Sequence, residues 1–197
     1  TATTEIYTLS LHDALPIYCL ADSREFGVVL IDRGHEVGGL DVRRSTGTVA
    51  RMVQVAELAD GRYGMITVGM RRIRVVDWLP DDPYPRAEVV EWTDHSDDRP
   101  VDLGALTVRV RRLAALALEL GDSTGDPAQD LAEDPEVLSY QLSTLAPLGP
   151  GDRYRLLEAE STPARVLLLA SLLDDVESAL SFRLTNGGSS SGSPATW

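Results

Sequence analysis

The stretch that decides the fold covers residues 47–76 and reads GTVARMVQVAELADGRYGMITVGMRRIRVV. β-branched and aromatic residues, which favour strands, recur in both halves of it. Between the halves lies Asp60-Gly61, a dipeptide that tolerates the positive φ angles of a tight hairpin turn. The stretch therefore predicts one long β-hairpin.

Strands are also predicted on both sides of this hairpin. Residues 26–31 form a continuous apolar run that is short enough for a buried strand. Residues 84–92 read YPRAEVVEW and have the alternating pattern of a strand. Residues 32–45 contain three of the chain's glycines, Gly34, Gly38 and Gly39, and are predicted to form a mobile loop.

Beyond residue 100, apolar residues no longer recur at every second position but about every 3.6 residues, the period of an α-helix. In the first predicted helix, Gly121 is well placed as the terminating residue. Its apolar positions step by three and four, and they are Leu103, Leu106, Val110, Leu113, Ala117 and Leu120.

Two more helices are predicted from a capping residue followed by proline, at Asp134-Pro135 and at Ser161-Thr162-Pro163. Pro147 is predicted to stop the first of them. The apolar positions are Leu138, Leu142 and Leu145 in the first, and Val166, Leu169, Leu173, Val176 and Leu180 in the second.

The predicted fold class is α+β, with strands first and helices second. Residues 18–92 are the β-rich part and residues 101–184 the helical part, joined by a charged, turn-forming linker at residues 93–100. Residues 185–197 are rich in Gly and Ser and are predicted to be a disordered tail.

The wording of the hairpin resembles a known family. Gly-Thr-Val-Ala-Arg from Gly47, Asp-Gly-Arg-Tyr from Asp60 and Val-Gly-Met-Arg-Arg-Ile-Arg-Val from Val68 resemble the core hairpin of the Lon protease N-terminal (substrate-binding) domain. Residues 139–159 resemble the helical part of stand-alone members of that family. The resemblance covers residues 18–184.

This resemblance implies a PUA-like β pseudo-barrel followed by a small helical bundle, with no cofactor. The implied function is non-catalytic binding of an unfolded or client polypeptide, or of a protease partner. Such a protein would act as an adaptor or substrate-recognition factor in proteolysis. Neither the binding-surface residues nor the oligomeric state can be read from the resemblance.

Residues 1–17 read TATTEIYTLSLHDALPI, and their back-translation resembles a common sequencing adapter. We therefore treat them as an artefact and exclude them from the sequence-based fold prediction. The alternative interpretation is a genuine amphipathic start around Leu9–Ile17. Members of the family begin with strands and a helix ahead of a Cys-Leu-Ala-Asp-like stretch, which corresponds here to Cys19 and the residues after it. The comparison predicts that the chain is truncated at its N-terminus.

Composition excludes two kinds of catalytic machinery. All 18 basic residues are arginine, and the sequence contains no lysine. A Walker A phosphate-binding loop and a Ser–Lys protease each require a lysine. Neither can be formed by this sequence, and no enzyme activity is predicted.

The net charge of −13, with 31 acidic residues, opposes contact with nucleic acid and with anionic membrane surfaces. The single cysteine, Cys19, forms no internal disulfide and fits a reducing cytoplasm. No apolar run reaches the length of about 18 residues that a membrane span needs. A cytoplasmic protein without membrane contact is therefore expected.

Three arginines of the hairpin, Arg71, Arg72 and Arg74, support an alternative function. Arg72 and Arg74 share one face of a strand, and PUA-like domains include RNA binders, so these side chains are candidate nucleic-acid contacts. The competing interpretation is a solvated face paired with nearby carboxylates. A second cluster consists of Arg109, Arg111 and Arg112.

No metal site or catalytic site is predicted. His35 and His95 are the only histidines outside residues 1–17, and neither has a second ligand at zinc spacing. A hydrolase would need a buried serine or cysteine beside one of them. Acidic pairs at Asp81-Asp82, Asp97-Asp98 and Asp174-Asp175 are interpreted as solvated. Met52, Met65 and Met70 fit either a core or an adaptable binding surface.

Overall fold

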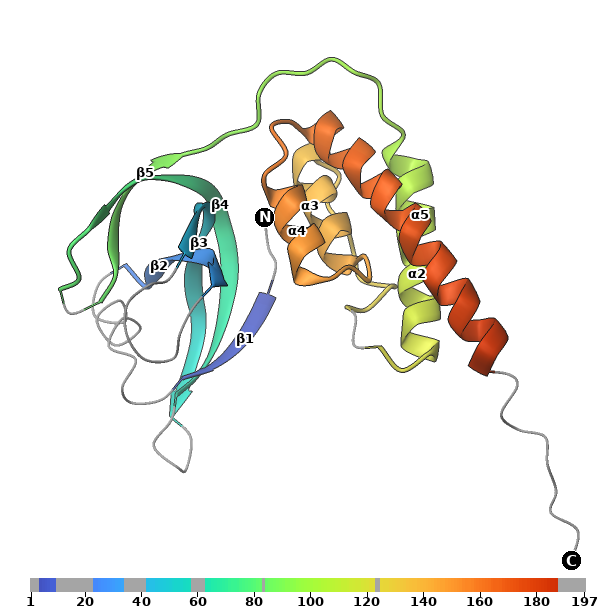
Figure 1. The fold of residues 1–197 in the computed structure, drawn as a ribbon, viewed down its shortest axis with the longest axis horizontal. Coiled ribbons are helices and arrows are strands. Elements are labelled where there is room, and N and C mark those ends of the chain that lie inside the picture. The colour runs from blue at the N-terminus through green and yellow to red at the C-terminus, as the bar shows by residue number, and fades with distance from the viewer. Residues whose placement is uncertain are drawn as a thin grey trace, which may run out of the picture. The chain divides into compact units, whose positions relative to one another are not determined.

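The computed structural model describes residues 4–9, 23–33, 42–57, 63–82, 84–122 and 125–187. The chain divides into a β-rich unit that ends at Asp94 and a helical unit that begins at His95. Strands fill the first unit and helices the second (Figure 1). This order confirms the predicted α+β class.

The β-rich unit is one antiparallel sheet in the order β1-β4-β3-β2, with β5 also paired to β4. β1 and β5 follow one another along the edge of β4 opposite β3, because β1 pairs with the first residues of β4 and β5 with its last. β1 lies within residues 1–17, the segment that the sequence-based fold prediction excluded. The strands are β1 (Thr4–Leu9), β2 (Glu25–Arg33), β3 (Val42–Glu57), β4 (Tyr63–Leu79) and β5 (Arg86–Glu91).

The predicted hairpin is confirmed as β3 and β4, which pair from Thr46↔Arg74 to Glu57↔Tyr63. The predicted turn at residues 58–62 lies outside the described residues. β2 and β5 confirm the two flanking strands. The prediction of a loop at residues 32–45 is wrong at both ends, because β2 continues to Arg33 and β3 begins at Val42; residues 34–41 are not described.

Gly47 allows β2 and β3 to approach closely. A Cβ atom at this position would lie 2.5 Å from the Val28 carbonyl oxygen and 2.7 Å from Val29 Cγ1. Both distances are well below van der Waals contact, and one of the obstructing atoms belongs to the backbone, which cannot move aside easily. Only glycine fits here without a shift of the strands.

The helical unit contains four described helices. Its N-caps follow the prediction: Asp134 Oδ1 accepts from the Val137 amide at 2.9 Å, and Ser161 Oγ accepts from the Ala164 amide at 3.2 Å. Gly121, with a φ of +87°, follows the end of the first helix as predicted. The helices are α2 (Leu103–Glu119), α3 (Pro135–Leu145), α4 (Pro150–Leu157) and α5 (Thr162–Gly187). None of them is both long and apolar enough to cross a membrane.

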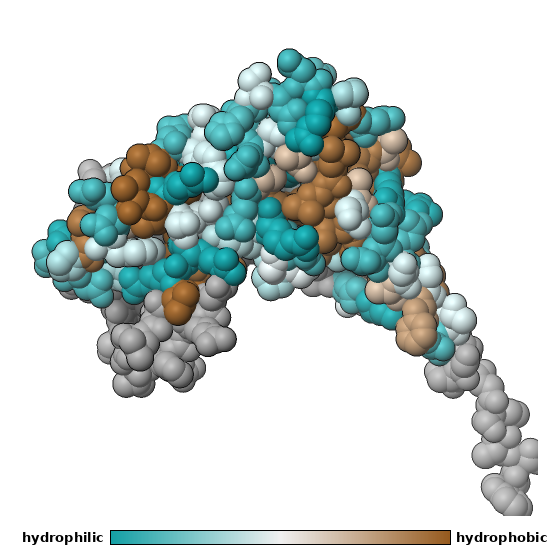
Figure 2. All heavy atoms as spheres, turned by 45° about the horizontal axis from the view of Figure 1, so that its top comes forward, coloured by the Kyte–Doolittle hydropathy of each residue, from teal (hydrophilic) through white to brown (hydrophobic). Residues whose placement is uncertain are grey.

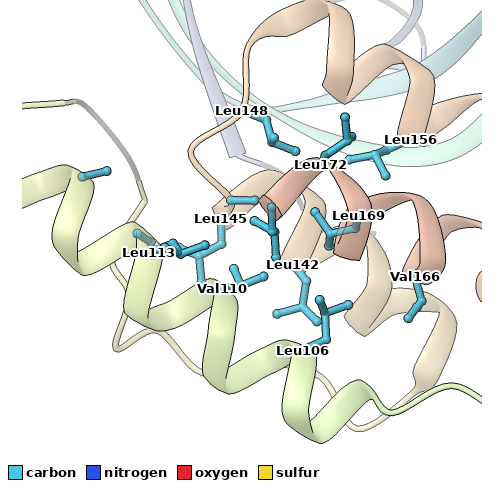
Figure 3. Packing of buried hydrophobic residues seen from close by; sticks show 14 of the residues in the cluster. Leu106, Val110, Leu113, Leu142, Leu145, Leu148, Leu156, Val166, Leu169 and Leu172 are labelled. Atoms are coloured by element: carbon cyan, nitrogen blue, oxygen red, sulfur yellow. The ribbon is translucent and has the colours of Figure 1, made fainter. Parts of the chain in front are cut away.

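One contiguous apolar core joins these helices. In Figure 3, Leu106, Val110 and Leu113 of α2 face Leu142 of α3 and Leu169 of α5. Fifteen buried side chains belong to this cluster among the described residues. Arg165 of α5 is buried with them, and its guanidinium donates to Ser139 Oγ, the Tyr140 hydroxyl and the Leu156 carbonyl. These bonds tie α5 to α3 and α4.

Ion pairs hold α2 against α5 at the surface. Arg109 donates to Asp174 at 2.6 Å and to Glu177 at 3.0 Å, and Arg112 also pairs with Glu177. Arg111 instead donates to the carbonyls of Pro127 and Gln129. The second arginine cluster therefore makes contacts within the helical unit.

The residues around the predicted linker are anchored, each in its own unit. On the β side, the Trp92 amide donates to the Arg72 carbonyl at 3.0 Å. On the helical side, the His95 amide donates to the Glu160 carbonyl at 2.8 Å. Asp97 accepts from Ser161 Oγ at 2.6 Å and pairs with Arg99. Residues 188–197 lie outside the described residues.

Candidate polypeptide-binding surface

The three arginines of the alternative function all contact protein groups. Arg71 pairs with Glu25 at 3.0 Å, and Arg51 pairs with the same carboxylate. The guanidiniums of Arg51 and Arg71 hold the pKa of the Glu25 carboxyl below its usual range. Arg74 is exposed and stacks on the Trp92 ring, with its guanidinium carbon 3.8 Å from the ring centroid.

Arg72 does not lie on a solvated face. Its side chain is 3% exposed and pairs at 2.7 Å with Asp94, whose side chain is 9% exposed. It also donates to the Trp92 carbonyl and lies 4.1 Å from the centroid of the Trp92 ring. The Arg72 side chain therefore holds the segment that follows β5 against strand β4. A phosphate would have to displace these contacts to reach the guanidinium.

Within the part of the chain that the structure describes, the candidate groups do not meet in a metal-binding cluster. Among the described residues, no three His, Cys, Asp or Glu side chains could hold a metal ion. His95 is exposed, whereas His35 and Cys19 lie outside the described residues. Of the methionines, Met52 and Met65 are buried in the β-rich unit and Met70 is partly buried.

Exposed apolar side chains gather at one end of the sheet. The last residues of β2 and β4 and the first residues of β3 and β5 lie at this end. The strand pairing shows this through the pairs Ile31↔Arg43, Thr46↔Arg74 and Leu79↔Arg86. Seven of the eight exposed large apolar residues described in the β-rich unit lie there. We call them the apolar end: Ile31, Val42, Val76, Trp78, Leu79, Val89 and Val90.

On one face of the sheet, the buried apolar side chains of β4 are followed by exposed ones of the apolar end. Ile73 and Val75 are buried, and their partners across the ladder, Glu91 and Val89, are exposed. Further along, Trp78 pairs with Ala87 and is partly covered by the Arg43 guanidinium, 4.9 Å from its ring centroid. Figure 2 shows brown apolar groups, interrupted by teal polar ones, on the β-rich unit at the left of the view.

β5 forms an edge of the sheet. Among the described residues it pairs only with β4, and every one of its side chains except that of Ala87 is exposed. An edge strand of this kind presents backbone N–H and C=O groups for pairing with another chain. The apolar end and the β5 edge therefore adjoin through Val89 and Val90.

Charges of both signs surround this surface, with Arg43 beside Trp78 and Arg74 beside Val90, but the stretch that leads into and forms β5 is acidic. From residue 77 to residue 91 the chain carries five carboxylates, at Asp77, Asp81, Asp82, Glu88 and Glu91, against one arginine. That arginine, Arg86, lies 3.7 Å from Asp82. Along this stretch of the chain the excess of negative charge favours cationic partners.

Sequence reasoning identified none of these surface residues. Alternation predicts a strand but not which of its faces stays exposed, so Val76 and Trp78 looked like ordinary strand residues. One local signal was available: Val89 and Val90 are adjacent. Two neighbouring apolar residues in a strand lie on opposite faces, which marks β5 as apolar on both sides.

Comparison with known proteins shows the family. Residues 7–175 match the model of the ATP-dependent protease La (LON) substrate-binding domain, so the chain belongs to this family. "Lon protease 2" of Myxococcus xanthus is 28% identical over 158 residues, which are 78% of this chain and 19% of that protein. "Lon protease 2" of Sorangium cellulosum is 31% identical over 137 residues, 66% of this chain and 17% of that protein. The chain thus spans less than a fifth of these relatives' length.

Solved structures agree on the fold. The Lon N-terminal domain protein from Xanthomonas campestris superposes with a TM-score of 0.63 at 23% identity, covering 86% of this chain and 89% of that one. The N-terminal domain of the Mycobacterium avium complex Lon protease gives a TM-score of 0.55 at 21% identity, with 89% and 92% covered. The predicted PUA-like fold is confirmed, and the matched region is the non-catalytic, substrate-binding part of the family.

Proposed function

We propose that this protein recognises polypeptides without catalysing their cleavage, and that its apolar end contacts them. The observation that carries the proposal is the gathering of seven exposed apolar side chains at one end of a sheet, in a chain that belongs to a substrate-binding family. Single exposed apolar residues are ordinary. Their concentration at one end of the sheet, on both of its faces, is what points to an interaction surface here.

The expected contribution of one anchor can be estimated. Complete burial of a valine or leucine side chain contributes about 1.5–3 kcal/mol, and about 1.4 kcal/mol changes an equilibrium constant tenfold. Val76 is 62% exposed, so a partner can cover much of its surface. Replacing this side chain by a polar one should weaken binding by roughly tenfold.

The experiment is a fluorescence-anisotropy titration of a labelled unfolded polypeptide with the wild-type chain, Val76→Ser and Val53→Ser. Val53 is the matched control, because it is also a valine, is 52% exposed and sits at an irregularity of the same hairpin, outside the apolar end. We expect Val76→Ser to weaken binding and Val53→Ser to leave it unchanged. Equal loss in both variants would contradict the assignment of the surface, and no binding by the wild-type chain would contradict the function.

The alternative function, RNA binding through Arg71, Arg72 and Arg74, is tested in the same titration with single-stranded RNA. Binding to phosphates releases counterions and weakens steeply as salt rises. Apolar recognition changes little over the same range. RNA binding that collapses with salt and is lost in Arg74→Gln would favour the alternative over polypeptide recognition.

We also propose an adaptor role in proteolysis, since the family's relatives are Lon proteases. A purified Lon protease would degrade a labelled unfolded polypeptide with and without this chain added separately. An adaptor should raise the degradation rate in proportion to the polypeptide bound, and Val76→Ser should lose that effect. An unchanged rate at saturating chain would overturn the adaptor role and leave polypeptide binding untouched.

A further inference from the structure

We propose that the outer edge of β5 binds an extended client segment, apolar and basic in sequence, as an additional strand of the sheet. This inference rests on the proposed polypeptide-binding function and assigns it a binding mode. Strand addition supplies affinity through main-chain hydrogen bonds and selectivity through alternate side chains.

The hydrogen-bond pattern determines which β5 groups point outward. The Trp92 amide donates inward to the Arg72 carbonyl, and the register continues through Ile73↔Glu91 and Arg74↔Val90. In an antiparallel ladder, bonded and non-bonded pairs alternate. Val90 therefore directs its backbone groups to β4, while Val89 and Glu91 direct theirs away from it, toward an added strand.

β5 suits strand addition better than β2, whose outer edge also has no partner strand among the described residues. The pairing of β2 shifts register on both sides of Ile31, and such irregularities blunt an edge. β5 itself is regular, because the shift in its pairing arises from the extra residue Val76 on β4. The side chains of β5 are exposed on both faces apart from Ala87.

Side chains around this edge define the client. A residue placed beside Val89 lies on the same face as Trp78 and Ala87, whereas one beside Val90 lies on the face of Arg74 and Trp92. The Val89 face favours apolar residues, whereas the Val90 face combines Val90 and the Trp92 ring with the Arg74 guanidinium. Around this edge five carboxylates, at Asp77, Asp81, Asp82, Glu88 and Glu91, outnumber two arginines, Arg74 and Arg86. This excess favours lysine or arginine in the client and disfavours acidic segments.

The first test removes one outward donor. Val89→Pro deletes an N–H that points away from β4, and proline is tolerated at such an edge position. Val89→Ala is the matched control, because it shortens the same side chain and keeps the amide. With a labelled apolar, lysine-containing peptide, we expect Val89→Pro to weaken binding by at least about tenfold and Val89→Ala by only about two- to threefold.

The second test uses the wild-type chain, so that it does not depend on the folding of a variant. Single N-methyl groups are moved along the peptide, each removing one N–H. Strand addition predicts losses of affinity at every second residue, because only alternate peptide N–H groups face β5. The same peptide with glutamate in place of lysine should bind more weakly.

The outcomes separate the two proposals. Wild-type binding with no period-two effect of N-methylation, and with Val89→Pro equal to Val89→Ala, would overturn strand addition and leave polypeptide binding standing. If the wild-type chain binds neither peptide nor unfolded polypeptide, the proposed function itself fails. Period-two sensitivity together with the selective loss in Val89→Pro would establish β5 as the binding edge.

Discussion

The two units of this protein place their apolar residues in opposite ways. Among the described residues, six apolar side chains are buried in the β-rich unit and sixteen in the helical unit. Large exposed apolar side chains follow the reverse order, with eight in the β-rich unit and five in the helical unit. The described residues of the helical unit thus form a buried apolar core, whereas those of the β-rich unit carry more exposed than buried apolar side chains.

The apolar end is continuous with the buried residues of the sheet. The interior strip of Ile73 and Val75 simply runs outward into Val89 and Trp78. A partner would complete the burial that the sheet begins. Because few of the apolar side chains described in the β-rich unit are buried, we expect the buried ion pair of Arg72 and Asp94 to contribute strongly to its stability.

Two spectroscopic probes can follow the units separately. Trp78 and Trp92 belong to the β-rich unit, so fluorescence reports on it. Circular dichroism at the helical band reports on α2, α3, α4 and α5. Trp197 lies outside the described residues, and a Trp197→Phe background removes its emission. Urea unfolding in that background, followed by both probes, gives a separate transition for each unit.

The largest effect is expected for Arg72→Met. Removing one partner of a buried ion pair leaves an uncompensated charge, at a cost of about 3–5 kcal/mol. The control is Arg74→Met, which loses an exposed cation–π contact to the same Trp92 ring, worth about 0.5–1 kcal/mol. Only the fluorescence transition should shift. An equal shift by circular dichroism would contradict the separate unfolding of the two units.

The next effect is expected in the helical core. Leu169 is fully buried, and Leu169→Ala should lower the free energy of unfolding by about 2–5 kcal/mol, since it removes burial and leaves a cavity. Val108, 70% exposed on α2, is the matched control, and Val108→Ala should stay within about 0.5 kcal/mol. The circular dichroism transition is measured. A small loss for Leu169→Ala would contradict a tightly packed helical core.

A pair of glycines should give effects of opposite sign. Gly47→Ala places a methyl group against the Val28 carbonyl oxygen and should destabilise the β-rich unit by about 1–3 kcal/mol. Gly151→Ala in α4 meets no atom within 4 Å and should stabilise the helical unit by up to about 1 kcal/mol. A stabilising Gly47→Ala would show that β2 and β3 can separate without cost.

How much of this fold could be predicted from the sequence depended on the kind of signal each element carries. The hairpin had Asp60-Gly61, and two helices had side-chain caps at Asp134 and Ser161. α4 was missed, because it has only eight residues and its N-cap, Gly149, offers no side-chain cap. Such a short helix depends on packing, which local patterns do not contain.

The candidate surface was beyond sequence reasoning for a related reason. Whether Val76 and Trp78 are exposed depends on which parts of the sheet the rest of the chain covers. The local sequence pattern around them would be the same in a fully buried strand. Arg72 illustrates the converse. Its position suggested a solvated face, and its burial required Trp92 and Asp94, twenty or more residues away, to fold back over it.

The smallest effect is a pH dependence centred on Asp97. Arg99, and after it Ser161, hold the pKa of the Asp97 carboxyl below its usual range. Because the folded pKa is the lower one, this stabilisation is present above the unfolded pKa of about 3.9. It is lost as pH falls through the folded pKa.

Asp97→Asn should therefore destabilise the helical unit at pH 7, and its difference from the wild-type chain should shrink on acidification. Urea midpoints are measured by circular dichroism from pH 7 downward. The neighbouring Asp98→Asn is the control, since Asp98 is exposed and Asp97 is the residue bonded to Ser161. A constant difference at every pH would contradict the assignment to Asp97.

The acidic rim of the β5 edge also bears on solubility. An exposed edge strand invites a second copy of the same chain to pair with it, and that is a common route to aggregation. Two β5 strands meeting edge to edge would bring Glu88 and Glu91 of each copy close to those of the other, in molecules that each carry a net charge of −13. Like charges across paired strands are destabilising. The same carboxylates that would select a basic client would therefore also oppose self-association through β5.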